Sequence, residues 1–229
     1  MIKRQYNKAV KWIEKNRFSL LLAATILVLV LPAFSGRGIV REILFVASMS
    51  FLFIQSMVVA TTRNNKRKGY RYFVVVFMSI LFWIEPFGLN TPYLDIIRMA
   101  LLVLFFVFVT ISLVRFMRKA GSVNVNVLMT AVNIYLLMGI ISSSFAFLFY
   151  KVYPGAYNFP SHITEPNFVT FNYYSFITMS TVGYGDITPA IPQTQTIAYL
   201  NAISGQLYVA IIMAFLVGKL LVHQPDDEK

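Results

Sequence analysis

The chain has 229 residues, of which 58% are hydrophobic and only 13% are charged, and its mean hydropathy is +0.67. Soluble domains average about 25% charged residues, so this composition predicts a polytopic membrane protein. There is no cysteine, which excludes disulfides, thiol nucleophiles and cysteine-ligated metals. The only imidazoles, His162 and His223, are far apart in the sequence, which argues against a histidine metal site.

Residues 1–17 are basic and are expected to form a cytoplasmic or interfacial segment. Ile2, Tyr6, Val10 and Ile13 recur at helical spacing with lysines between them, which is typical of a helix lying on a membrane surface. A plain charged anchor is the equally simple alternative. A secretory signal peptide also begins with a basic segment, but no soluble domain follows the first apolar run.

Six apolar runs approach the length of about 20 residues that a membrane span needs. They lie at 18–34, 39–60, 70–89, 92–114, 127–150 and 194–222. A seventh run, 166–179, is too short to cross and has the length of a re-entrant segment. The expected fold class is therefore an all-α membrane protein with six transmembrane helices and a re-entrant helix.

The net charge of +11 would suggest nucleic acid as a partner of a soluble protein, but its distribution predicts membrane topology instead. Sixteen of the 20 lysines and arginines lie before the first span, after the second, after the fourth and at the C-terminal end. These regions alternate, so they share one side of the membrane. By the positive-inside rule both termini are expected in the cytoplasm, with lipids rather than nucleic acid as surroundings.

Residues 178–186 form the one sharp motif, Thr-Met-Ser-Thr-Val-Gly-Tyr-Gly-Asp. A dehydrated monovalent cation needs oxygen ligands to replace its water, and backbone carbonyls supply them without a full charge. Directing successive carbonyls at one axis needs unusual backbone angles, which glycine reaches without steric cost. The candidate ion-binding residues are Thr181, Val182, Gly183, Tyr184 and Gly185. One chain supplies one strand, so a ring of ligands requires several copies.

The run Thr181-Val182-Gly183-Tyr184-Gly185-Asp186 resembles the selectivity filter of six-transmembrane tetrameric potassium channels. The resemblance implies a homotetramer in the cell membrane that conducts K⁺ passively, with the permeant ion at residues 181–184 and no organic cofactor. It also implies a pore helix at 166–179, for which Thr164 or Glu165 is the expected cap and Pro166 a first-turn residue.

Four residues are expected to support the filter: Tyr173 and Tyr174, where many relatives have tryptophans, Thr178, and Asp186 at the outer mouth. The chain departs from the family at Ile177, where relatives often carry a glutamate. An inactivation mechanism that depends on such a glutamate is therefore in doubt.

The resemblance divides the chain into a voltage-sensor-like domain at 18–120, a pore domain at 121–222 with the filter at 181–186, and a cytoplasmic tail at 223–229. The first domain lacks a charge ladder, because its fourth span holds only Arg98, which Asp95 or Glu85 is expected to neutralise. Weak or absent voltage dependence is therefore expected. The cytoplasmic segments are too short for a soluble ligand domain.

The resemblance also implies a gating hinge near the middle of the last span, where Gly205 is the candidate, and a packing role for Gly205 is the alternative. Below it, Val209, Met213 and residues 215–217 are candidates for an apolar constriction. Two other functions stay open, a weakly selective cation channel and a non-conducting scaffold or sensor subunit with a pore-like fold. No nucleophile–base pair supports an enzyme, and a prokaryotic origin is expected.

Overall fold

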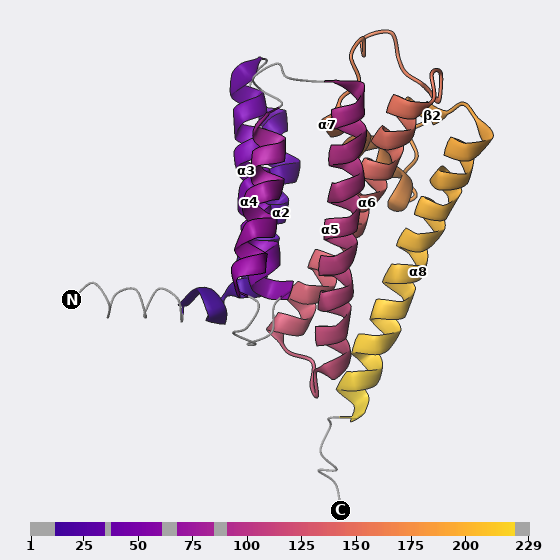
Figure 1. Cartoon of the computed structure of the whole chain (residues 1–229). Helices are drawn as coiled ribbons and strands as arrows, with labels where there is room; N and C mark the ends of the chain where they lie inside the picture. Colours follow the sequence, from indigo (N-terminus) through magenta and orange to yellow (C-terminus); the bar gives the residue numbers. More distant parts are fainter. Residues whose placement is uncertain (1–11, 35–37, 61–67, 85–90, 223–229) are drawn as a thin grey trace, which may run out of the picture.

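A computed structural model describes residues 12–34, 38–60, 68–84 and 91–222, and these residues are almost entirely helical (Figure 1). The elements are α2 (Arg17–Phe34), α3 (Ile39–Ala60), α4 (Lys68–Trp83), α5 (Pro92–Lys119), α6 (Val125–Val152), β1 (Tyr157–Asn158), α7 (Phe168–Met179), β2 (Thr188–Pro189) and α8 (Pro192–Val222). The all-α fold is confirmed. Predictions for residues 1–11, 85–90 and 223–229, including Glu85 and His223, lie outside the described residues.

Among the described residues, four helices are long and apolar enough to cross a membrane: α3, α5, α6 and α8. The helices α2 and α4 are apolar but shorter, so the total of six spans stays a prediction. Both α5 and α6 have 28 residues and exceed the runs predicted at 92–114 and 127–150. At 1.5 Å per residue each is about 42 Å long, which is longer than the roughly 30 Å hydrocarbon core.

Local sequence explains where these two long helices begin. The Thr91 side chain accepts a hydrogen bond from the Leu94 amide, with proline following as the first helical residue of α5. Asn124 caps α6 in the same way through the Val127 amide. Only residues 120–124 separate the two helices, so α5 turns back and packs along α6 of its own chain (Figure 1).

The other helices are arranged around this pair. On one side α2 packs against both α3 and α6, and α4 packs against α3; α8 lies on the other side, against α6 (Figure 1). An aromatic cluster joins α3, α4 and α5, where the fully buried Phe53 ring lies 5.3–5.9 Å from the rings of Phe82, Phe105 and Phe106. A buried hydrogen bond from Asn133 Nδ2 to the Phe18 carbonyl (3.1 Å) joins α6 to α2.

A short helix, α7, lies where the re-entrant segment was predicted and packs between α6 and α8, but the predicted start of this helix was wrong. The helix begins at Phe168, and Asn167 caps it in a reciprocal pair with Thr170. Pro166 therefore precedes the cap, and neither Thr164 nor Glu165 serves as one. An asparagine followed three residues later by a threonine satisfies both end amides locally, which the proline pattern did not reveal.

Candidate functional site

The segment that follows α7 is tied to the end of that helix by its own backbone. The Thr181 amide donates to the Thr178 carbonyl (3.0 Å), and the Gly183 amide donates to the Ile177 carbonyl (3.1 Å). The Ser180 hydroxyl donates to the Phe176 carbonyl (2.8 Å). These bonds use carbonyls that the helix end would otherwise leave unpaired, and they direct the chain sharply away from the helix.

Residues 181–185 alternate in backbone handedness. Thr181, Gly183 and Gly185 have φ of +63°, +52° and +77°, whereas Val182 and Tyr184 lie outside the positive-φ region. Such alternation turns successive carbonyls toward one side of the strand. A left-handed conformation costs a non-glycine residue about 1–2 kcal/mol, and Thr181 is the only described non-glycine residue that adopts one. Strain of this kind collects at functional sites, where the surroundings enforce it.

The same segment is uncovered by the rest of the chain. Residues 180–186 are all exposed, with Val182 at 51% and Tyr184 at 71%. A Cβ placed on Gly183 or Gly185 would meet no atom within 4 Å. Polar backbone without regular hydrogen bonds is tolerated at membrane depth only where it lines water or is buried in protein. An exposed strand of this kind therefore needs a watery cavity or further protein around it.

The structure brings two of the four predicted supporting residues together. The Tyr173 hydroxyl donates to Asp186 Oδ2 (2.8 Å), which joins α7 to the far end of the strand. Thr178 instead bonds to the Tyr174 carbonyl within its own helix (2.7 Å). Tyr174 is buried, with its ring 5.4 Å from that of Tyr157 in the loop before α7.

A short antiparallel ribbon closes the loop around α7 and the strand. In β1 and β2, Tyr157 pairs with Pro189 and Asn158 pairs with Thr188. The Thr194 hydroxyl at the start of α8 donates to the Ala156 carbonyl (2.9 Å), which anchors the ribbon to the last helix. Burial raises the pKa of the Tyr157 hydroxyl above its ordinary value, because the charged phenolate would lose its hydration.

Contacts with α8 hold α7 from the other side, and sequence reasoning missed most of them. Asn201 Nδ2 donates to the Ser175 carbonyl (2.9 Å), and Gln206 Nε2 lies 3.5 Å from the Thr181 hydroxyl oxygen. A Cβ on Gly205 would overlap the Met179 carbonyl. The packing alternative for Gly205 thus has a direct structural basis, and the hinge stays a prediction. The sequence signal for these contacts was the pair of amide side chains, Asn201 and Gln206, five residues apart in an otherwise apolar span.

The apolar positions proposed for a constriction do not share one environment. Val209, Met213 and Val217 are about half exposed on α8, whereas Phe215 and Leu216 are partly buried against the core. Tyr208 also faces inward, and its hydroxyl donates to the Ala131 carbonyl of α6 (2.6 Å). The first three residues therefore remain candidates, and residues 215 and 216 support the packing of α8 instead.

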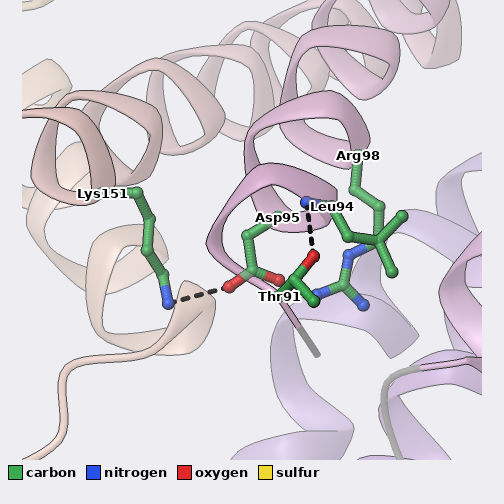
Figure 2. Close-up of polar contacts among 5 residues, drawn as sticks. All are labelled: Thr91, Leu94, Asp95, Arg98 and Lys151. Carbon is green, nitrogen blue, oxygen red and sulfur yellow. Dashed lines mark hydrogen bonds and ion pairs between the residues drawn. The ribbon is translucent and has the colours of Figure 1, made fainter. Parts of the chain in front are cut away.

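A second polar cluster joins α5 to α6 at the opposite end of these helices from the connector (Figure 2). Asp95 pairs with Arg98 one turn later, and Arg98 is the largest fully buried side chain described. The other Asp95 oxygen lies 2.9 Å from Lys151 Nζ near the end of α6. The expected Arg98–Asp95 pair is confirmed, and the Lys151 contact was missed because 56 residues of sequence separate it from Asp95.

Residues 134–221 match a protein-family model described as an ion channel. This segment is similar to the ion-channel domains that the model describes. It contains most of α6 and all of α7, the exposed strand and nearly all of α8. The match supports an ion channel in a membrane rather than an enzyme. No curated protein and no solved structure matches the chain. Within the described residues, no group of three or more metal-ligating side chains gathers.

Proposed function

We propose that the chain is a potassium-selective channel that works as a homotetramer. The observation that carries the proposal is the strand at 181–185, which is exposed, alternates in handedness and carries the Thr-Val-Gly-Tyr-Gly sequence. Four such strands around an axis would present carbonyls of Thr181, Val182, Gly183 and Tyr184 to a dehydrated K⁺ ion. Transport is then passive, and K⁺ is the permeant ion rather than a cofactor that the protein retains.

The end of α7 supports the same proposal. A helix C-terminus carries partial negative charge, and this one lies directly before the strand at Ser180. Such an end favours a cation in the space below the strand. With both termini in the cytoplasm, as the basic loops predict, that space faces inward and the Tyr173–Asp186 bond lies at the outer mouth.

Ion flux into liposomes tests the proposal. Purified protein should carry K⁺ and exclude Na⁺ and Li⁺ when all three compete. Equal Na⁺ flux would support a weakly selective cation channel, and no flux across lipid composition and pH would support a non-conducting scaffold. Either result would overturn the proposal that the chain is a potassium-selective channel.

Gly183→Ala tests the strand itself. Alanine disfavours the left-handed backbone by about 1–2 kcal/mol in each of four copies, so K⁺ flux or selectivity should be lost. Gly69→Ala is the matched control, because that glycine has open space and no positive φ, and its flux should equal wild type. Wild-type selectivity in Gly183→Ala would refute the filter assignment.

A further inference from the structure

A pocket of about 340 Å³ lies where α5 ends and α6 begins, and its lining includes no residue of the strand at 181–185. Its lining consists of Phe116, Lys119, Ala120, Gly121, Ser122 and Asn124. One aromatic ring, one cation and several small or polar residues thus share one opening.

The length of α5 places this pocket at the surface of a membrane. Asp95 and Lys119 lie on one continuous helix, 24 residues and about 36 Å apart, which exceeds the roughly 30 Å hydrocarbon core. The Asp95–Lys151 pair at one end of α5 and Lys119 at the other end then lie at opposite surfaces of the membrane. The basic loops assign the Lys119 end to the cytoplasmic face.

Cations gather around the pocket. Arg17, at the start of α2, lies with its Cζ 4.7 Å from the centre of the Phe18 ring and 5.7 Å from that of the pocket residue Phe116. The last turn of α5 also holds Arg118. Within the part of the chain that the structure describes, neither Arg17 nor Lys119 forms an ion pair. No carboxylate among the described residues therefore offsets the charge of either side chain.

Two features of the lining favour a lipid over a soluble anion. Phe116 gives the pocket an apolar wall beside Lys119, which suits the junction between a headgroup and its acyl chains. The positive end of the α6 dipole, at Asn124, lies at the same opening and adds to the attraction for a phosphate. Basic pockets between membrane helices on the cytoplasmic side bind such headgroups in other proteins.

We propose that this pocket binds the phosphate headgroup of an anionic phospholipid, with Lys119 and Arg17 as its cationic contacts. The inference is independent of ion conduction and stands even if the pore does not select K⁺. A simpler role for Lys119, stabilising the C-terminal end of α5, predicts an effect on stability but none on lipid binding.

Binding of fluorescent phosphatidylglycerol to the purified full chain in zwitterionic detergent tests the proposal. One saturable site per chain is expected, with binding about fivefold weaker in Lys119→Ala and in Arg17→Ala, because each cation near a membrane surface contributes about 1 kcal/mol. Lys119→Arg keeps the positive charge, so it should bind the lipid as tightly as wild type does. Lys15→Ala, which removes an exposed charge outside the pocket, should bind as wild type does.

Four outcomes would overturn the proposal. Equal binding in all variants would show that the pocket takes no part. An equal loss in Lys15→Ala would show a diffuse attraction to the basic face. Displacement of the lipid by millimolar inorganic phosphate would assign the pocket to a soluble anion, and equal affinity for phosphatidylcholine would exclude charge recognition altogether.

Discussion

Glycines in this chain act through two different physical requirements. Gly183 and Gly185 adopt left-handed backbone with open space around them. Gly205 and Gly139 lie in regular helices, and there a side chain would collide with α7: with the Met179 carbonyl at Gly205 and with the Phe176 ring at Gly139. The first pair shapes the strand, and the second pair lets α6 and α8 approach the helix that holds it.

The variant Gly205→Ala should destabilise the protein by about 1–3 kcal/mol, because the added methyl group overpacks the contact between α8 and the end of α7. Thermal or denaturant unfolding in detergent measures the change. Gly218→Ala is the matched control in the same helix, with open space at its Cβ, and should be neutral or slightly stabilising. Equal stability of the two variants would remove the packing role and leave the hinge as the better explanation.

Among the elements, α5 is fixed to α6 by an ion pair and does not carry the regularly spaced arginines of a voltage sensor. Its single buried arginine, Arg98, is already neutralised by Asp95, which also contacts Lys151 of α6. The remaining bases of α5, Arg115, Arg118 and Lys119, lie at the opposite end. Steep voltage gating uses about three or four charges per subunit, and α5 offers none that is uncompensated within the span.

Neutralising Arg98 should therefore leave any voltage dependence nearly unchanged. The steepness of the current–voltage relation in planar bilayers measures this, with Arg118→Gln as a control in the last turn of α5. Arg98→Gln alone leaves part of a buried ion pair uncompensated, at a cost of about 3–5 kcal/mol, so the double variant Asp95→Asn/Arg98→Gln should also be recorded. A large loss of steepness in either variant would show that Arg98 senses voltage.

In the whole molecule, two surfaces are left largely uncovered by the chain itself: the last helix, α8, and the exposed strand. In α8 only 17% of the apolar stretch that could span a membrane is buried by the rest of the chain, whereas in α3, α5 and α6 the buried share is 44–50%. The exposed strand at 181–185 contacts this helix through a hydrogen bond from the Gln206 side chain to the Thr181 hydroxyl. Lipid satisfies apolar side chains but not exposed backbone carbonyls, so the strand supplies the stronger argument for further copies.

Native mass spectrometry of the detergent-solubilised protein should accordingly show assemblies of four 26.1 kDa chains. Cross-linking between single cysteines placed on α8 gives an independent readout, because the natural chain has no cysteine. A monomer or dimer that still carries selective K⁺ flux would contradict the shared filter.

Composition and local pattern in the sequence were enough to predict the membrane class, the helical fold, and the short helix that precedes the 181–186 motif. These features depend on apolar run length and on residues adjacent in the chain, so no tertiary information is needed. The same local reasoning misplaced the α7 cap, because it weighed Pro166 above the side-chain pairing of Asn167 with Thr170.

Only the tertiary structure decided which distant residues meet. The Asp95–Lys151 pair, the Tyr173–Asp186 bond and the fit of Gly205 against Met179 join segments 13 to 56 residues apart. Helical periodicity gives the face of a residue on its own helix but neither the neighbour of that face nor its register. Those contacts arise from the packing of helices against one another, and they determine how the strand is held.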